Sequence, residues 1–358
     1  MRWGGPAAAS AVAEVWARRL ATVETVVEVA PIPEADAIVR ARIRGWDVVV
    51  KLGEFVPGDR CVYFEVDSLL DVADPRFAFL APRGVRTDVE GRSGHVLKTA
   101  RLRGQYSQGL ALPLAGFPGL ADAQPGTDVT AALGIVKWDP PIPAQLAGEV
   151  RGRLPSWIPV TDEERIQNMP TILAVEGVAW VATEKLDGTS CTVYVDPHGE
   201  QGVASRNLDL RPSETNTRWN LVRRHAIHAE LAHSYPDQYA VLQGEIYGES
   251  IQGNPLKVRG QHFAAFTLRV GSGEVPRRDW PDWALDLSVP VRALPFPADV
   301  DAALAQVDGL TSALVPDKAA EGLVWRAVDA ATVVLPGGQV VRASFKVVSN
   351  RYLLKHDR

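Results

Sequence analysis

The sequence predicts an α+β protein of two domains, a small β-barrel followed by a larger domain of antiparallel sheets with flanking helices. The chain has 358 residues, and at roughly 100–200 residues per domain this length indicates two domains. Short strand-like runs fill residues 22–135, whereas strands and helices mix from residue 175 onward. Glycine and proline are plentiful, at 30 and 26, which favours many turns and short strands over long helices.

The region 22–135 is predicted to be a small barrel because its short strands alternate with turn signals such as PGD, EGRSG and RGQ. The OB-fold is the small barrel that fits this pattern best. An SH3-like barrel or a sandwich fits the same pattern, and both alternatives stay open. The strand-like runs are TVETVVEV (22–29), AIVRARIRGWDVVVKL (37–52), DRCVYFEVDSLL (59–70), HVLKTARLR (95–103) and GLALPL (109–114).

A proline-rich segment, residues 137–159, follows the barrel region. It has no clear period, so we interpret it as a linker or crossing segment. We place the domain boundary near residue 140, which gives a first domain at 22–140 and a second at 141–358. The Ala-rich residues 1–21 form an N-terminal extension, either a short helix or an extended start.

Two segments of the second domain are predicted to be helical. TDEERIQN (161–168) starts a helix, since Thr161 at the N-cap and Glu164 three residues later form a capping box. Two interpretations of this segment stay open: Arg165 or Asn168 contributes to the site, or the residues only start the helix. Residues 217–235 form a second helix, whose apolar side consists of Trp219, Leu221, Val222, Ala226 and Leu231.

Charge, cysteine content and hydropathy narrow the class of protein. The net charge is −5, so nucleic-acid binding must use local basic patches. Cys61 and Cys191 are far apart and form no CxxC motif, which fits a reducing cytoplasm. No apolar run reaches the ~18 residues that a membrane span needs, and the N-terminal stretch does not resemble a secretion signal. We therefore predict a cytoplasmic protein without membrane attachment.

The stretch TEKLDGTS (183–190) contains a candidate catalytic lysine. It lies between the apolar, strand-prone runs GVAWVA and TVYV. A lysine becomes a nucleophile at neutral pH when burial or neighbouring cations lower its pKa. A strand end holds Lys185 rigidly, and the tight Asp187-Gly188 turn leaves room for a bulky substrate. Taken alone, the stretch also fits a plain β-hairpin with a solvated lysine.

Five further motifs follow this stretch and place acidic and basic residues near the ends of apolar runs. They are SRN (205–207), LQGEIYG (242–248), HFAAF (262–266), EGLVWR (321–326) and SFKVVSN (344–350). In order and spacing, the six motifs resemble the covalent nucleotidyltransferase superfamily of DNA ligases, RNA ligases and mRNA capping enzymes. The resemblance covers about residues 160–358.

Within that superfamily the chain is most similar to the Deinococcus-type RNA ligases, over nearly its full length. RLRGQYSQGLALPL (101–114), TDEERIQN and FKVVSNRYLLKH (345–356) resemble segments of that family. The domain order also agrees with these RNA ligases, in which an OB-like domain comes first, as the predicted barrel does here. DNA ligases and capping enzymes carry an OB domain after the catalytic core. The resemblance implies that the second domain is an adenylyltransferase domain, which takes ATP as its AMP donor and uses Mg²⁺ or Mn²⁺.

The resemblance also implies a role for each matching residue. Lys185 attacks the α-phosphorus of ATP, Glu321 organises the divalent metal, and Lys346 contacts the α-phosphate and helps to keep Lys185 deprotonated. Phe266, on the opposite face of its strand from Phe263, competes with it for stacking on adenine. The residues implied to bind the nucleotide are Glu184 in the adenine pocket, Lys185, Arg206, Glu245 on the ribose hydroxyls, Phe263 on adenine, and Lys346.

The chain departs from the superfamily pattern at two positions. The last motif usually offers two lysines one residue apart, whereas Ser344-Phe345-Lys346 keeps only the second. One lysine is therefore implied to contact the phosphate where the superfamily usually has two. Related RNA ligases often have asparagine where Ser190 stands, so a direct phosphate contact by this residue is not implied.

Two basic clusters are the candidate contacts to nucleic acid. The cluster of the first domain lies near Phe77, Phe79 and Tyr106, and a basic groove with aromatic residues is how OB-folds often bind strands. A solvated barrel face is the alternative. The predicted contacts are Arg83, Arg86, Arg92, Lys98, Arg101 and Arg103 in the first domain, and Arg218 and Arg223 in the second.

We predict from these features an ATP-dependent RNA ligase that joins a 3′-hydroxyl to a 5′-phosphate through a lysyl-AMP intermediate. Its partners are ATP and a nicked duplex with RNA on the 3′-hydroxyl side, as in RNA repair, and no obligate protein partner is evident. The alternatives within enzymes are a DNA ligase and a capping-type guanylyltransferase. From another class, the chain could be a nucleic-acid-binding protein with an inactive nucleotidyl site.

Overall fold

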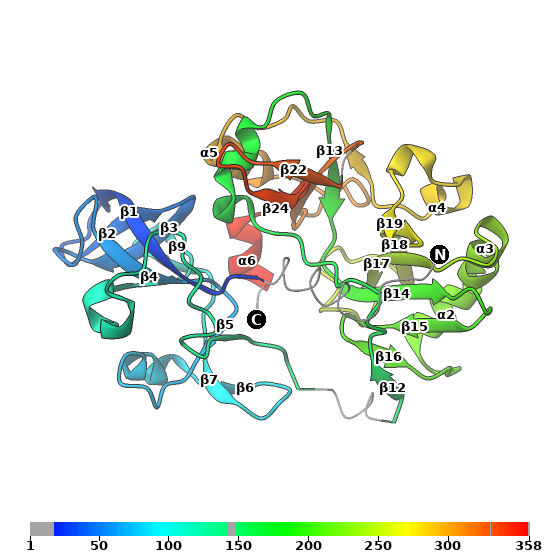
Figure 1. Ribbon diagram of the computed structural model, residues 1–358, viewed down its shortest axis with the longest axis horizontal. Helices are drawn as coiled ribbons and strands as arrows, with labels where there is room; N and C mark the ends of the chain where they lie inside the picture. The colour runs from blue at the N-terminus through cyan, green and yellow to red at the C-terminus, as the bar shows by residue number, and fades with distance from the viewer. Residues whose placement is uncertain (1–17, 142–147, 330, 357–358) are drawn as a thin grey trace. The chain divides into compact units, whose positions relative to one another are not determined.

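The computed structural model of the chain describes residues 18–141, 148–329 and 331–356 (Figure 1). The predictions for residues 1–17 of the N-terminal extension and 142–147 of the proline-rich segment lie outside these ranges. The described residues form two compact units, each of which is described by itself below. The first holds 18–141, 167–170 and 353–356, and the second holds 148–166, 171–329 and 331–352.

Short antiparallel strands make up most of the first unit. Its strands and 3₁₀ helices are β1 (Ala21–Pro31), β2 (Ile38–Ile43), β3 (Trp46–Lys51), β4 (Arg60–Phe64), β5 (Ser68–Leu70), η1 (Ala78–Arg83), β6 (Arg86–Thr87), β7 (Ser93–Val96), β8 (Ala100–Leu102), β9 (Gln105–Ser107), β10 (Leu110–Pro113), η2 (Leu114–Gly116), η3 (Pro118–Leu120) and β11 (Val136–Lys137). One sheet has the strand order β10-β4-β1-β2-β3, and a smaller one has the order β11-β5-β7-β6. The remaining strands, β8 and β9, pair as a hairpin.

The larger sheet closes into a barrel because the segment that leads into β10 returns to the edge of β3. Gln108 N donates to Asp47 O over 2.8 Å, and Val49 N donates to the Ser107 hydroxyl over 2.9 Å. The sequence of β2, IVRARI, favours this arrangement, because its alternate apolar residues are buried while the residues between them are partly exposed. The predicted run 37–52 is thus two strands joined by a tight turn.

Aromatic side chains fill the barrel. Trp46 and Phe64 have no exposed surface, and the ring of Phe77 meets that of Phe64 edge-on with centroids 5.1 Å apart. Phe77 therefore belongs to the core, and its predicted role as a stacking face for nucleic acid is wrong. Phe79, by contrast, is 53% exposed.

The second unit combines two antiparallel sheets with short helices. Its elements are β12 (Val150–Arg153), β13 (Trp180–Lys185), β14 (Thr189–Val195), β15 (Gln201–Ala204), β16 (Leu208–Leu210), α2 (Thr217–Arg224), α3 (Ile227–Ser234), β17 (Ala240–Gly248), β18 (Gln261–Val270), β19 (Gly273–Glu274), η7 (Arg277–Asp279), α4 (Asp282–Asp286), β20 (Val291–Arg292), α5 (Val300–Val307), β21 (Gly322–Ala327), β22 (Thr332–Val334), β23 (Val340–Arg342), β24 (Ser344–Val348) and α6 (Asn350–His356). The large sheet has the order β12-β16-β15-β14-β17-β18-β19, and the small one has the order β20-β13-β21-β24.

The strands β13 and β14 are neighbours in sequence but belong to different sheets (Figure 1). The Leu186–Gly188 turn between them therefore joins the two sheets and is not the turn of a β-hairpin. This excludes the plain hairpin that the sequence left open. The residue before the turn, Lys185, stands at the end of β13, where both sheets can supply neighbours.

Helices α2 and α3 cover one face of the large sheet. Trp219, Leu221 and Ile227 of the helices share an apolar core with Leu242 and Ile246 of β17. Because side chains alternate across a strand, the odd-numbered residues of β17 lie on the other face. None of the helices in the described residues has the length and apolar character that a membrane span requires.

The helix predicted at residues 217–235 is two helices. Ala226 adopts a left-handed backbone conformation with φ of 51° and ends the regular pattern between α2 and α3. Ala226 is exposed, and Ile227 and His228 are buried in its place. A single helical period could not predict this shift of the buried face.

The helix predicted at residues 161–168 is also wrong. Residues 161–164 have no regular structure, and 3₁₀ helices η5 (Ile166–Asn168) and η6 (Pro170–Ala174) follow. The supposed capping box does not form, because Glu164 accepts a hydrogen bond from the neighbouring Arg165 N over 2.9 Å. Tertiary contacts of the acidic residues, described below, override the local signal.

We expect Gly322→Ala to destabilise the second unit, because a Cβ at Gly322 would lie 2.1 Å from the carbonyl oxygen of Val347 in the adjacent strand. Overpacking of this kind typically costs about 1–3 kcal/mol. Gly337→Ala is the matched control, since nothing lies within 4 Å of a Cβ there. Urea denaturation of both variants checks the prediction, and equal unfolding free energies for the two would contradict it.

Candidate active site

The candidate site is centred on Lys185, whose ammonium group binds the carboxylate of Glu321. The Nζ–Oε1 distance is 2.6 Å, and the two side chains are 28% and 13% exposed. Strand pairing brings these residues together, because Lys185 lies opposite Gly322 in the register of β13 and β21. The motifs KLDG and EGLVWR, far apart in sequence, thus meet at one end of the small sheet.

The large sheet supplies a second carboxylate. Glu245 in β17 pairs in register with Ser190 at the start of β14, directly after the turn that follows Lys185. Gly188 allows this approach, since a Cβ there would lie 2.2 Å from the carbonyl oxygen of Ile246. The glycine is therefore required by the close contact of the turn with β17.

The third carboxylate belongs to Asp187, for which the sequence predicted a role only in the tight turn after Lys185. Its Oδ2 accepts a hydrogen bond from the hydroxyl of Tyr352 in α6 over 2.9 Å. This contact fixes the turn between the two sheets from the side of the last helix. Asp187 also raises the pKa of Lys185, so its carboxylate lies within the field of the amine.

Lys185 is an ammonium group in this cluster. Burial lowers its pKa, but the carboxylates of Glu321, Glu245 and Asp187 outweigh burial and raise its pKa above the ordinary value. Burial raises the pKa of Glu245 to about 8 against the opposing effect of Lys185. The expectation that neighbouring cations keep Lys185 deprotonated is therefore wrong for the protein without nucleotide.

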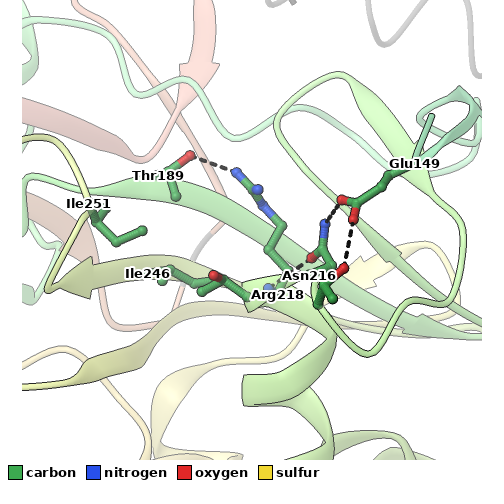
Figure 2. A pocket seen from close by; sticks show the side chains of 8 residues that line it. Glu149, Thr189, Asn216, Arg218, Ile246 and Ile251 are labelled. Atoms are coloured by element: carbon green, nitrogen blue, oxygen red, sulfur yellow. Dashed lines mark hydrogen bonds between the residues drawn. The ribbon is translucent and has the colours of Figure 1, made fainter. Parts of the chain in front are cut away.

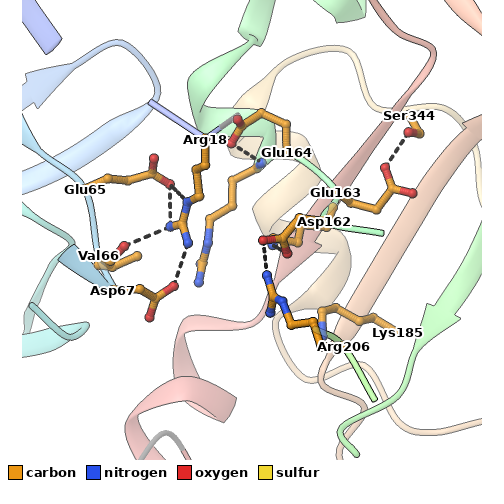
Figure 3. A network of polar contacts seen from close by, with 12 residues as sticks. Arg18, Glu65, Val66, Asp67, Asp162, Glu163, Glu164, Lys185, Arg206 and Ser344 are labelled. Atoms are coloured by element: carbon orange, nitrogen blue, oxygen red, sulfur yellow. Dashed lines mark hydrogen bonds and ion pairs between the residues drawn. The ribbon is translucent and has the colours of Figure 1, made fainter. Parts of the chain in front are cut away.

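Arg206 and Lys346, two of the predicted nucleotide contacts, share one acidic partner. Arg206 donates to the carboxylate of Asp162 (Figure 3), and Lys346 Nζ lies 3.7 Å from its other oxygen. Burial raises the pKa of both Glu245 and Glu321, and the charges of Arg206 and Lys346 respectively oppose part of this rise. Both cations therefore belong to the same cluster as Lys185.

The segment that carries Asp162 is held against β24. Lys346 N donates to Glu164 O over 2.7 Å, and Arg165 forms an isolated parallel bridge with Lys346. For this segment the sequence left open a role for Arg165 or Asn168, and it missed Asp162. Asn168 instead accepts a hydrogen bond from the indole of Trp46 over 2.5 Å within the first unit.

Glu163 anchors the same segment in the interior. Its buried carboxylate accepts hydrogen bonds from Arg326 in β21 and from the hydroxyl of Ser344 in β24, the latter seen in Figure 3. Arg342 Nη1 lies 3.7 Å from the same carboxylate. Burial would raise the pKa of Glu163, but Arg342 and Arg326 outweigh it and bring the pKa down to about 2.

Two predicted nucleotide contacts lie away from this cluster. Glu184 points to the opposite face of β13 from Lys185, where its carboxylate accepts from Arg292 Nη1 over 3.0 Å and Ala313 N over 2.6 Å. Phe263 pairs with Ile246 and is buried with it in the core under the helices. A ring stacked on adenine is therefore a wrong assignment for Phe263. Glu184 is on the same face of β13 as Leu186, and its place in the adenine pocket stays a prediction.

Phe266 lies on the opposite face of β18 from Phe263. A bulge at Gln243–Gly244 gives Phe266 no partner in the register of β17 and β18. Its half-buried ring packs with Leu186, the residue after Lys185, and with Tyr247. Phe266, the competing candidate from the sequence, is thus the phenylalanine beside the cluster.

A pocket of about 340 Å³ lies next to the start of β14 (Figure 2). Arg218 of α2 lines it and donates to Ser190 O over 3.0 Å and to the Thr189 hydroxyl over 2.7 Å. Arg223 donates to Ser213 O over 2.9 Å. Both arginines thus support the protein's own backbone, and their contact with nucleic acid stays a prediction.

The predicted basic cluster of the first unit faces solvent. The guanidinium of Arg86 and the ammonium of Lys98 lie 5.3 and 5.9 Å from the ring centroid of Trp138. Arg101 lies 5.5 Å from the ring of Tyr106. The exposed arginines of the cluster are Arg83, Arg86, Arg92, Arg101 and Arg103.

Comparison with protein families supports the fold. An OB-fold domain model matches residues 20–114, which confirms the predicted OB-like barrel, and an RNA ligase model matches residues 178–348. The second match spans the stretch from the strand before Lys185 to the last residue of β24. No match was found among the curated proteins.

Solved structures of an RNA ligase from Naegleria gruberi are similar to nearly the whole chain. An alanine variant of that ligase with AMP and manganese is 40% identical, with 95% of this chain and 99% of that chain covered and a TM-score of 0.83. A second alanine variant, with ATP and manganese, is 40% identical over 94% and 99% of the chains, with a TM-score of 0.82. The ligase with pyrophosphate is 40% identical over 96% and 100%, with a TM-score of 0.82.

Glu163→Gln tests the anchor of the segment that carries Asp162. The charged carboxylate, with its pKa lowered from 4.5 to about 2, stabilises the fold above pH 4.5, and this contribution is lost as the pH falls toward 2. We expect the variant to lower the unfolding free energy at neutral pH by about 3 kcal/mol, since it removes the buried carboxylate that pairs with Arg326 and Arg342 and leaves them only Glu274 as an acidic partner in the described residues. Urea denaturation from neutral to acidic pH checks this, and the difference from the unmodified protein should shrink on the acid side.

The control for this variant is Asp308→Asn, which removes a carboxylate that pairs with Arg351 over 3.5 Å at an exposed site. Exposed ion pairs contribute roughly 0–1 kcal/mol, so we expect a small change without a marked pH dependence. A loss of stability as small for Glu163→Gln as for the control would contradict the anchoring role.

Proposed function

The chain belongs to the RNA ligase family, and from this we propose that it is an ATP-dependent ligase that seals nicks through an AMP-carrying Lys185. The observation that supports the proposal is the cluster around Lys185. Residues from five separate motifs contribute Lys185, Glu245, Glu321, Arg206 and Lys346 to one site in the second unit. An inactive nucleotidyl site would not need this set of charged residues in one place.

In the first step Lys185 Nζ attacks the α-phosphorus of ATP. A nitrogen–phosphorus bond forms, the bond from the α-phosphorus to the bridging oxygen breaks, and pyrophosphate leaves with the electron pair. The ammonium must first lose a proton, and Glu321 Oε1 at 2.6 Å is the acceptor in contact with it. Arg206 and Lys346 supply positive charge where the phosphates gain negative charge.

A divalent metal ion fits the residues that are present. Glu321 Oε2 is buried and makes no hydrogen bond within the described residues, which leaves it available as a ligand. The described part of the chain holds no group of three or more acidic, histidine or cysteine residues that could bind a metal by itself. Mg²⁺ or Mn²⁺ would therefore be held by Glu321 together with water and phosphate oxygens, and its charge would neutralise the triphosphate.

The base and sugar of the nucleotide are recognised by groups on the large sheet. Phe266, beside Leu186, offers a half-buried ring for stacking on adenine. Glu245 accepts hydrogen bonds from the ribose hydroxyls. The alternative, a guanylyltransferase, would bind guanine in the same place, and no observation in the described residues favours it.

Two further steps complete the reaction. The 5′-phosphate of the nicked strand attacks the phosphorus of the lysyl-AMP, which releases the Lys185 amine and forms a 5′–5′ pyrophosphate linkage. The 3′-hydroxyl then attacks the 5′-phosphate, loses its proton and expels AMP. We propose that the basic cluster of the first unit positions the duplex through its phosphates and that RNA is required on the 3′-hydroxyl side.

Sealing of four nicked duplexes tests this function. The strand that ends in the 3′-hydroxyl and the strand that begins with the 5′-phosphate are each made of RNA or of DNA. We expect sealing with ATP to be at least about tenfold faster when the 3′-hydroxyl strand is RNA, because a site built to pair with a hydroxyl rejects ligands without it. Equal sealing of all four, or sealing of the all-DNA nick alone, would support a DNA ligase instead.

The assignment of the stacking residue gives a separate prediction. Phe266→Ala should raise the KM for ATP by about tenfold, since stacking on a base is worth about 1–3 kcal/mol. Phe263→Leu keeps most of the buried volume of the core side chain and should leave the KM nearly unchanged. A larger effect on KM from Phe263→Leu than from Phe266→Ala would show that the assignment to Phe266 is wrong.

A further inference from the structure

Asp162 occupies an unusual position, because its carboxylate binds both cations that the proposed reaction assigns to phosphate. Arg206 contacts one oxygen of Asp162 and Lys346 Nζ lies 3.7 Å from the other. The side chain of Arg206 is 40% exposed, that of Lys346 is 12% exposed and that of Asp162 is 33% exposed. An anion that approaches Arg206 and Lys346 must therefore compete with a carboxylate already in place.

The backbone at this position is fixed by its neighbours in the chain, whereas the side chain of Asp162 is partly exposed to solvent. Glu163, the next residue, is locked in the interior by Arg326 and Ser344. The hydrogen bond from Lys346 N to Glu164 O, 2.7 Å long, holds the segment on its other side. The side chain of Asp162 is 33% exposed, so a ligand can reach its contacts with Arg206 and Lys346 while the segment stays in place.

A carboxylate resembles a phosphate in charge and in the geometry of its oxygens, and arginine recognises both with the same planar group. The pairs of Asp162 keep Arg206 and Lys346 in position and satisfy them when no nucleotide is bound. A neutral ligand does not replace these pairs, whereas a ligand with phosphate oxygens does.

We propose that Asp162 is a specificity-determining residue that holds the place of a nucleotide phosphate on Arg206 and Lys346. A nucleotide binds by displacing this carboxylate, and a nucleoside without phosphate leaves it in place. The proposal rests on the proposed function in that it takes these two cations as the phosphate site. It adds a competing group that lowers the affinity for every phosphate-bearing ligand and sharpens the difference between nucleotide and nucleoside.

Calorimetric titration with AMP and with adenosine tests the proposal on the unmodified full chain, on Asp162→Asn and on the control Asp308→Asn. We expect Asp162→Asn to bind AMP about three- to tenfold more tightly, the range typical of a partly exposed charge-assisted contact. Adenosine binding should change by less than about twofold, and Asp308→Asn should match the unmodified protein with both ligands. Thermal unfolding verifies that the variant is folded, and Asp162→Ser replaces it if it is not.

Equal or weaker AMP binding by the folded variant would overturn the proposal, because Asp162 would then assist the cations without competing for them. A similar gain with AMP and adenosine would overturn it too, since the effect would not depend on phosphate. The absence of AMP binding by any of the proteins would also count against it. A different result would contradict the proposed function, namely the absence of a covalent nucleotide on Lys185 after incubation with ATP.

Discussion

The ion pair between Lys185 and Glu321 is the constraint on which the site depends. Two opposite charges that are partly removed from water stabilise each other, because a partly buried charge without a partner is costly in free energy. The pair forms only because β13 and β21 are adjacent in one sheet, and it is surrounded by further carboxylates at Glu245 and Asp187. Burial lowers the pKa of Lys185, but its acidic neighbours, Glu321 foremost, raise it by more, so the nucleophile is stored as a cation until ATP and a metal ion change its surroundings.

The same pattern of paired charges holds the rest of the site. Arg206 and Lys346 are paired with Asp162, and the adjacent Glu163 is paired with arginines of β21 and β23. Lys185, Arg206 and Lys346 thus each have an acidic partner within the second unit, and each partner comes from a segment held by strands. Rigid strands and exchangeable partners together give a site that is organised before the substrate arrives.

Sequence reasoning could find the residues whose position follows from strand patterns and motif order. The barrel, most strands, and the set Lys185, Glu321 and Lys346 were predictable in this way. The faces of strands were harder, because the pairing of Phe263 with Ile246 under the helices decides that Phe266 and not Phe263 lies beside the cluster. A propensity cannot reveal which face of a strand the helices cover.

Other errors have an equally physical cause. The residues 161–168 carry a good helix signal, yet Asp162 and Glu163 make long-range pairs that a helix would not permit. The pKa of Lys185 was predicted from its cationic neighbours, whereas the carboxylates brought close by the fold decide it. Contacts between distant segments, which no local pattern encodes, account for both.

The measurement that tests the central claim most directly is the location of covalently bound AMP by peptide mass spectrometry. The protein is incubated with ATP and Mg²⁺ or Mn²⁺, unfolded and digested without acid, which would cleave a phosphoramidate. We predict a single modified peptide with AMP on Lys185, and no modified peptide from Lys185→Ala. AMP on another residue, or its absence from folded protein that binds ATP, would contradict the role of Lys185 as the carrier.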